Sequence, residues 1–240
     1  MTDLHTHILP GLDDGARDIS ESVKMIAAEY ADGVRKIVCS SHFSSESLSV
    51  EEFAEKREIA FEKVRKATEE ILGDLSWKRG AEVYFSPRLL ETEADKLCIE
   101  GTPYMLIELP TAFKPFAMRE TLISLRNCGI IPLIAHVERY DYLMNDLALL
   151  YELVENGIWM QVNCQSILTP GRNRRQLFKM IRYGLIQVAA TDAHGAEKRP
   201  PNMKAGLAVL RKRLGDACTD SLIENAERIF EGKDLADDQE

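Results

Sequence analysis

All five histidines of the chain lie in short motifs, and each motif stands where a predicted strand ends. They are His5 and His7 in Asp-Leu-His-Thr-His, His42 in Cys-Ser-Ser-His, His136 in Ile-Ala-His-Val-Glu-Arg, and His194 in Thr-Asp-Ala-His. Histidine is the most common metal ligand and the usual acid or base near neutral pH. Since the carboxyl ends of parallel strands share one edge, these histidines predict a single site that holds more than one ion.

Carboxylates accompany the histidines at the same places. Glu82, Glu108 and Asp192 stand near the ends of apolar strands, and Asp14 follows Asp13 in the loop after the first strand. A buried carboxylate is costly unless a cation balances it. Taken alone, each position has an ordinary structural interpretation, such as a salt bridge or a hydrogen-bonded loop residue. Together, nine nitrogen and carboxylate donors without a thiolate suit manganese, iron, zinc or magnesium, and they predict two or three ions.

Two arginines follow histidine motifs closely. Arg139 comes after His136, and Arg199 comes after His194 in a segment that ends Arg-Pro-Pro. Their planar forks suit the oxygens of a phosphate group, although a surface salt bridge is the more common role of an arginine in a loop. Because adjacent metal ions activate water and clamp the oxygens of a phosphoryl group, the pattern favours metal-assisted phosphoester hydrolysis.

Composition limits the class of protein. With 240 residues, of which 45% are hydrophobic, we expect one domain over residues 1–240 with a frayed acidic end at roughly 234–240. The net charge of −9 argues against a nucleic-acid partner. No apolar run is long enough to cross a bilayer, and the first residues show no signal segment, so we expect a cytoplasmic protein without membrane insertion.

The cysteines exclude two further classes. There are 5, an odd number without a Cys-x-x-Cys motif, which argues against a disulfide framework or a zinc ribbon. Cysteine-dependent phosphatases place an arginine six positions after the nucleophile. The corresponding residues here are Ser45, Tyr104, Ile134, Pro170 and Glu224. Phosphatase chemistry in this chain must therefore proceed without a cysteine nucleophile.

Strand and helix patterns alternate along the whole chain. The predicted strands are Thr2–His5, Arg35–Ser40, Ser76–Tyr84, Tyr104–Leu109, Ile130–Ala135, Ile158–Asn163 and Ile186–Ala190. The predicted helices are 18–33, 49–73, Arg88–Lys96, Phe116–Cys128, Leu143–Asn156, Arg174–Tyr183, Asn202–Leu214 and Ser221–Phe230. Seven strand–helix repeats favour a closed α/β barrel. An open doubly wound sheet is the alternative, but no Gly-x-Gly-x-x-Gly follows the first strand.

The motifs together resemble the PHP (polymerase and histidinol phosphatase) superfamily. Within it, the chain looks most like the bacterial manganese-dependent protein-tyrosine phosphatases of capsule and exopolysaccharide gene clusters. The resemblance covers nearly the whole chain. Its landmarks are Asp3–His7, Gly11–Gly15, Ser41-His42, Gly80–Tyr84, Leu106–Glu108, Ile134–Tyr140, Gln161–Asn163, and Thr191–His194 followed by Arg199-Pro-Pro201.

The resemblance implies a distorted seven-stranded (β/α)7 barrel with three metal ions, manganese being the expected metal. The first ion would be held by His5, His7, Glu82 and Asp192; the second by Glu82, Glu108 and His136; the third by Asp14, His42 and His194. Arg139 and Arg199 would take the phosphate, and a metal-bridging hydroxide would attack phosphorus directly. The implied substrate is phosphotyrosine on an autophosphorylating bacterial tyrosine kinase that regulates polysaccharide synthesis. Some relatives self-associate, so a homo-oligomer is possible.

One departure from the pattern concerns the substrate. Some relatives carry a second histidine after the equivalent of His42, where this chain has Phe43, and the loop 43–49 is serine-rich and lacks basic residues. Two other functions stay open at this point. One is a phosphoesterase of the same superfamily that acts on a small molecule such as histidinol phosphate. The other is a non-catalytic metal-binding protein that docks a kinase.

Overall fold

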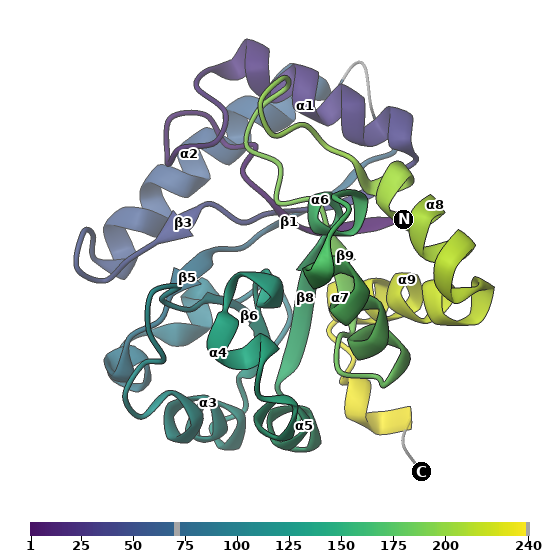
Figure 1. The fold of residues 1–240 in the computed structure, drawn as a ribbon. Coiled ribbons are helices and arrows are strands. Elements are labelled where there is room, and N and C mark those ends of the chain that lie inside the picture. Colours follow the sequence, from purple (N-terminus) through teal and green to yellow (C-terminus); the bar gives the residue numbers. More distant parts are fainter. Residues whose placement is uncertain (70–72, 239–240) are drawn as a thin grey trace.

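The computed structural model describes residues 1–69 and 73–238 as an α/β fold with a curled, parallel sheet surrounded by helices (Figure 1). A three-stranded sheet has the order β1-β2-β4, and a six-stranded sheet has the order β3-β5-β6-β7-β8-β9. The strands are β1 Thr2–Thr6, β2 Lys36–Cys39, β3 His42–Phe43, β4 Ser76–Arg79, β5 Glu82–Tyr84, β6 Tyr104–Glu108, β7 Ile131–Ile134, β8 Trp159–Asn163 and β9 Val188–Ala190. Every pair of neighbouring strands is parallel.

The described residues thus form nine strands in place of the seven that the sequence predicts. The expected strand 76–84 is interrupted between β4 and β5, and only two residues, Ser40 and Ser41, separate β2 from β3. At this break the Glu82 amide lies within hydrogen-bonding distance of both serine carbonyls. Two sheet segments result because the pairing is interrupted there. A bridge between Thr6 and Ala193 connects β1 to the chain that follows β9.

The helices lie outside the strands (Figure 1). They are α1 Ile19–Asp32, α2 Val50–Thr68, α3 Met118–Asn127, α4 Asp141–Met144, α5 Leu147–Glu155, α6 Cys164–Leu168, α7 Arg172–Arg182, α8 Met203–Leu214 and α9 Asp216–Phe230. Asp18 caps α1, which ends at Gly33 with a φ of 93°, and Ser49 with Glu52 forms the expected capping box of α2. The predicted end of the second helix includes residues 70–72, which lie outside the described residues.

Three predicted helices differ from the structure. The expected helix Arg88–Lys96 is two short 3₁₀ segments, η1 Pro87–Glu91 and η2 Ala94–Leu97. The expected helix Leu143–Asn156 is divided into α4 and α5, because the Asp146 side chain accepts a hydrogen bond from Leu149 and starts a new helix. The last helix begins at Asp216 rather than Ser221. The sequence interpretation also missed α6, which directly follows β8.

The expectation of a frayed end from residue 234 is wrong for the first of these residues. Asp234 pairs with Arg126, and the Leu235 side chain is buried in a hydrophobic cluster. The Leu235 amide donates to the Tyr104 hydroxyl, and the backbone then forms a 3₁₀ turn, η4 Leu235–Asp238. The ion pair of Asp234, the buried Leu235 side chain and the hydrogen bond of its amide together anchor this segment.

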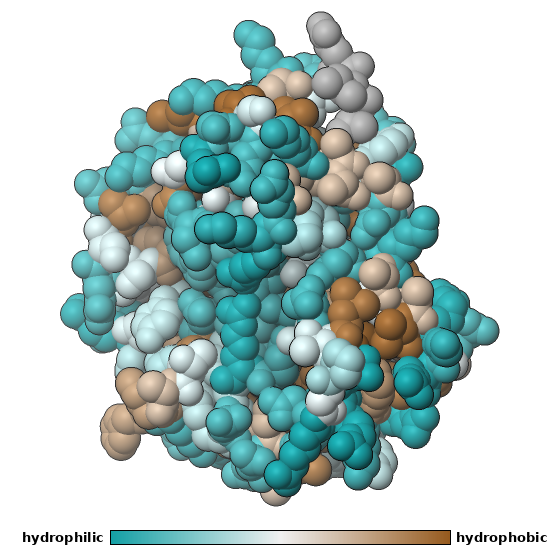
Figure 2. Space-filling model, turned by 45° about the horizontal axis from the view of Figure 1, so that its top comes forward, coloured by the Kyte–Doolittle hydropathy of each residue, from teal (hydrophilic) through white to brown (hydrophobic). Residues whose placement is uncertain are grey.

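The surface of the protein is mostly polar, as the share of charged residues in the sequence leads one to expect. The face in Figure 2 is mainly hydrophilic, and its hydrophobic side chains lie in a few separate groups. Within residues 1–69 and 73–238, no helix is both long enough and apolar enough to cross a membrane.

A buried pair of acidic side chains joins α1 to the sheet. Asp3 on β1 and Glu29 on α1 are both fully buried, and the Thr191 hydroxyl contacts both carboxyl groups. Burial raises the pKa of Glu29 well above 4.5, and the neighbouring Asp3 charge raises it further. Glu29 therefore holds a proton in the folded protein at a pH at which it would ionise in the unfolded chain.

This pair makes the stability of the protein depend on pH. A raised folded-state pKa means that stability falls as pH rises from the unfolded value of 4.5 towards the folded value. Glu29→Gln keeps a donor towards Asp3 and cannot ionise. We expect its Tm to exceed that of the unaltered protein by a few degrees at pH 8 but not at pH 4.5. A difference in Tm that does not change between these two pH values would contradict the assignment.

Candidate metal centre

The structure brings together all nine side chains that the sequence singles out as metal ligands. They lie on β1 and the loop after it (His5, His7, Asp14), on β3, β5 and β6 (His42, Glu82, Glu108), and just beyond β7 and β9 (His136, Asp192, His194). The backbone is strained at two of these positions. His136 has a φ of 31° and Asp192 a φ of 53°, in the left-handed region that only one other non-glycine residue of the described chain, Ala117, occupies. Such strain is often found at functional sites.

The innermost group consists of His5, His7, Glu82 and Asp192, and all four side chains are buried. The Nε2 atoms of the two histidines are 3.2 Å apart, and each lies 3.1 Å from Glu82 Oε2. Asp192 Oδ1 lies 3.5 Å and 3.6 Å from the same two nitrogens. Ligands about 2.1 Å from a tetrahedral ion are about 3.4 Å apart, so the spacing of these four atoms fits one cation.

The surrounding hydrogen bonds point the lone pairs of both histidines into this group. His5 Nδ1 lies 3.1 Å from Gln161 Oε1, and His7 Nδ1 lies 2.8 Å from Asp13 Oδ2. Since these oxygens are acceptors, each Nδ1 is placed to donate to its partner, and each Nε2 is directed into the inner group. Glu82 Oε2 and Asp192 Oδ1 are buried without a hydrogen-bond donor. Four acceptor atoms facing one another are stable only around a positive charge.

The electrostatics of the inner group also favour positive charge. Burial acts to lower the pKa of His7, yet Asp13 and Glu82 raise it to about 10. Burial acts to raise the pKa of Glu82, but the nearby His5 charge and the hydrogen bond from His136 hold it well below its usual range. The carboxylates thus create a site that takes up either protons or a metal cation.

A second group surrounds the other oxygen of Glu82. His136 Nε2 lies 2.7 Å from Glu82 Oε1 and 3.7 Å from Glu108 Oε1. His42 Nδ1 also faces this region, 3.2 Å from Glu82 Oε2 and 3.6 Å from Glu108 Oε2. Burial, together with the Glu82 charge, raises the pKa of Glu108 to about 7. Glu82 is therefore shared between two groups of donors. His42, which the resemblance assigns to the third ion, also faces Glu108 of the second group.

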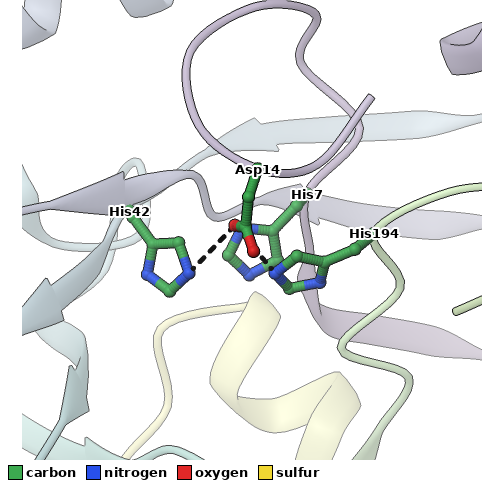
Figure 3. Close-up of side chains that lie close together, drawn as sticks. All are labelled: His7, Asp14, His42 and His194. Carbon is green, nitrogen blue, oxygen red and sulfur yellow. Dashed lines mark ion pairs between the residues drawn. The ribbon is translucent and has the colours of Figure 1, made fainter. Parts of the chain in front are cut away.

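The third group lies closest to solvent and is shown in Figure 3. The Asp14 carboxylate lies between two histidine rings, with Oδ1 at 3.5 Å from His42 Nε2 and 3.3 Å from His194 Nε2. The His7 ring lies behind them, and its centroid is 3.8 Å from that of His194. The Asp14 side chain is 69% exposed, so this group is open to solvent.

Both predicted arginines converge on one oxygen atom of the centre. Arg139 and Arg199 each donate to Asp192 Oδ2, the Arg199 bond being 2.6 Å long. Asn163 Nδ2 donates to the same oxygen at 2.6 Å. Both guanidinium groups are about 40% exposed and line a pocket that also contains Lys198. Asp192 therefore keeps one oxygen for the inner group and uses the other to hold two cationic side chains at its border.

The sequence interpretation did not assign roles to the residues that orient these ligands. The Gln161 side-chain oxygen contacts His5 Nδ1 and accepts from the His136 amide at 2.7 Å. Gln161 Nε2 in turn donates to Asn163, and Asp13 accepts from the His42 amide. The pattern Gln-Val-Asn carried a usable signal, because residues two apart on a buried strand point to the same side and both are polar.

Comparisons with known proteins identify the family of the chain. The profile of the family described as capsular polysaccharide synthesis, CpsB/CapC, matches residues 1–231. The tyrosine-protein phosphatase CpsB of Streptococcus pneumoniae is 33% identical over 90% of this chain and 91% of its own length. The tyrosine-protein phosphatase YwqE of Bacillus subtilis is 30% identical over 98% of this chain and 93% of its own length.

A solved structure extends the similarity to three dimensions. It comes from work on YwqE of Bacillus subtilis and CpsB of Streptococcus pneumoniae, described as metal-dependent tyrosine phosphatases. It superimposes on this chain with a TM-score of 0.86 and 28% identity, covering 97% of this chain and 95% of the other. The chain belongs to the CpsB/CapC family of capsular polysaccharide synthesis.

Proposed function

We propose that this protein is a metal-dependent phosphotyrosine-protein phosphatase. Its proposed substrate is an autophosphorylating bacterial tyrosine kinase that regulates the synthesis of capsular or extracellular polysaccharide. One observation carries the proposal: buried carboxylate oxygens of Glu82 and Asp192 face the Nε2 atoms of His5 and His7, at a spacing that fits one cation. The names of the relatives, which are tyrosine-protein phosphatases, support the choice of substrate.

The nine side chains are proposed to hold three ions, with manganese as the expected metal. His5, His7, Glu82 and Asp192 form the first set. The second consists of Glu82, Glu108 and His136, with His42 at its border, and the third consists of Asp14, His42 and His194. We further propose that the two sheets act as one distorted seven-stranded barrel, in which β2 with β3 and β4 with β5 each occupy one strand position.

Bound divalent cations would acidify water and offset the charge of the phosphate. Side chains of the protein would position the phosphate group. Arg139 and Arg199 present half-exposed guanidinium groups beside the inner set, where their forks can hold two phosphate oxygens. Asp192 keeps both arginines at this border before substrate binds. Cys39 and Cys164, the cysteines at strand ends, are poor nucleophiles, because burial raises the pKa of their thiols.

A kinetic experiment tests this proposal. Protein loaded with manganese should release phosphate from a phosphotyrosine peptide with a higher kcat/KM than from histidinol phosphate. His136→Ala removes a donor of the second set and should lower this activity more than about a hundredfold. Tyr183→Ala, on an exposed residue after α7, is the matched control and should leave activity unchanged. Equal activity in a chelated sample, or a preference for histidinol phosphate, would contradict the proposal.

A further inference from the structure

Tyr84, the last residue of the motif Gly80–Tyr84, has no role in the metal centre. Tyr84 ends β5, two residues after Glu82. Residues two apart on a strand point to the same side, and Glu82 points into the metal centre. The Tyr84 side chain therefore projects from the same face of the strand at its open end. It is 41% exposed, an unusual degree of exposure for a large aromatic ring beside a buried cluster.

Tyr84 is also directly beside Glu108. The two residues are paired in the register of β5 and β6, and the amide that follows Tyr84 donates to the Glu108 carbonyl at 2.8 Å. Neighbouring strands are about 4.8 Å apart, so the tyrosine ring borders a donor of the second set.

Two further tyrosines, in the segment that follows β7, lie near the same edge of the metal centre. The Tyr140 ring is buried against His136, and the Tyr142 ring stacks on it with centroids 5.8 Å apart. The Tyr142 hydroxyl donates to the Pro110 carbonyl at 2.7 Å, which fixes the half-buried ring beside the end of β6. Burial raises the pKa of Tyr142, and the neighbouring Tyr84 phenol raises it further. Tyr84, Tyr140 and Tyr142 thus all lie at the carboxyl end of β6, and we call these three residues the aromatic wall.

The aromatic wall and the two arginines, Arg139 and Arg199, lie on different sides of the metal centre. In the segment after β7, Arg139 reaches Asp192 near β9, whereas Tyr140 and Tyr142 reach the backbone of Leu109 and Pro110 after β6. The other loops around the centre offer different chemistry: 43–49 is rich in serine, and the hollow beside Asp14 is lined by charged side chains such as Arg17, Glu21 and Lys24. The tyrosine side therefore presents aromatic rings on which an apolar, aromatic group can stack.

We propose that Tyr84, together with Tyr142, receives the aryl ring of the substrate and makes the site selective for aryl over alkyl phosphates. The inference rests on the proposed phosphatase function and names the residues that select its substrate. A phosphate group held by Arg139 and Arg199 beside the metal centre would leave its ester group free to turn towards this wall. Stacked aromatic pairs contribute enough to change affinity about tenfold. The phenol hydroxyl of Tyr84 is not needed for this contact.

Binding of two phosphonates to the metal-loaded protein tests this inference without turnover. Phenylphosphonate and methylphosphonate share the same anionic head and differ in the ring. Calorimetry should show that the unaltered protein binds phenylphosphonate about tenfold more tightly. Tyr84→Ala should remove this preference and leave the affinity for methylphosphonate unchanged, whereas Tyr84→Phe should retain it. Tyr183→Ala, which removes a tyrosine ring that is 72% exposed elsewhere, is the control and should also retain it.

The outcomes separate this inference from the proposed function. A preference for phenylphosphonate that survives in Tyr84→Ala, or that is missing from the unaltered protein, would overturn the inference. Loss of binding of both phosphonates in Tyr84→Ala would also overturn it, because the residue would then serve the metal centre as a whole. Failure of the unaltered protein to hydrolyse a phosphotyrosine peptide would instead overturn the proposed function.

Discussion

Glu82→Gln is expected to reduce the kcat/KM for a phosphotyrosine peptide by more than about a hundredfold. Substitutions of groups that merely orient a metal ligand cost about 10–100-fold, and Glu82 lies inside two donor groups at once. Its Oε2 faces His5 and His7, and its Oε1 faces His136. An amide has nearly the same shape but no charge, so it would weaken two ions together.

Steady-state kinetics and metal analysis of the same preparation measure this effect. The bound metal per chain should fall with the activity. Glu29→Gln is the matched control, since Glu29 is equally buried, has a pKa raised by that burial and lies outside the donor groups; its activity should stay within about threefold of the unaltered protein. If Glu82→Gln retained its metal and most of its activity, Glu82 would not be the shared ligand.

Removal of the metal should destabilise the protein strongly. A ligand present at a thousand times its Kd stabilises the folded state by about 4.1 kcal/mol. For a chain of 240 residues, each kcal/mol changes Tm by about 2–4 °C, so each tightly bound ion should contribute about 8–16 °C. The buried acceptors of the inner group would otherwise have to take up protons, which the raised pKa of His7 favours.

Thermal unfolding with and without a chelator measures this contribution. The Tm should fall on chelation and recover when manganese is added in excess. In His136→Ala the fall should be smaller, because the variant begins with weaker metal binding, and in Tyr183→Ala it should be unchanged. A Tm that does not depend on the metal in the unaltered protein would mean that the four buried donors are satisfied by protons alone.

The sequence predicts where the strands lie better than it predicts the breaks within them. Each of the seven predicted strands overlaps an observed one, and for several of them this is because continuous apolar runs mark buried parallel strands. The breaks at Ser40-Ser41 and at Gly80-Ala81 depend on tertiary contacts. A Cβ added at Gly80 would lie 2.8 Å from a Val38 methyl group, so β2 packs closely against the chain there. The division between α4 and α5 depends on a single capping side chain, Asp146, within an otherwise helical pattern.

For the site, the sequence predicts which side chains converge better than it predicts the residues that orient them. Histidines and carboxylates at strand ends are conspicuous because few other roles explain them. Gln161, Asn163 and Asp13 act through hydrogen bonds to ligands that are distant in the chain, such as the 3.1 Å contact between Gln161 and His5. Polar residues of this kind occur in many strands and loops, and only the folded arrangement distinguishes them. The convergence of both arginines on Asp192 Oδ2 likewise depends on how the loops fold.

Anomalous diffraction from crystals grown with manganese tests the central claim most directly. We expect peaks of metal density at three positions: among His5, His7, Glu82 and Asp192; between Glu82, Glu108 and His136; and between Asp14, His42 and His194. The first peak should lie about 2.0–2.2 Å from each of its four donor atoms. Absence of density among the four buried donors, or metal bound only elsewhere on the protein, would contradict the account.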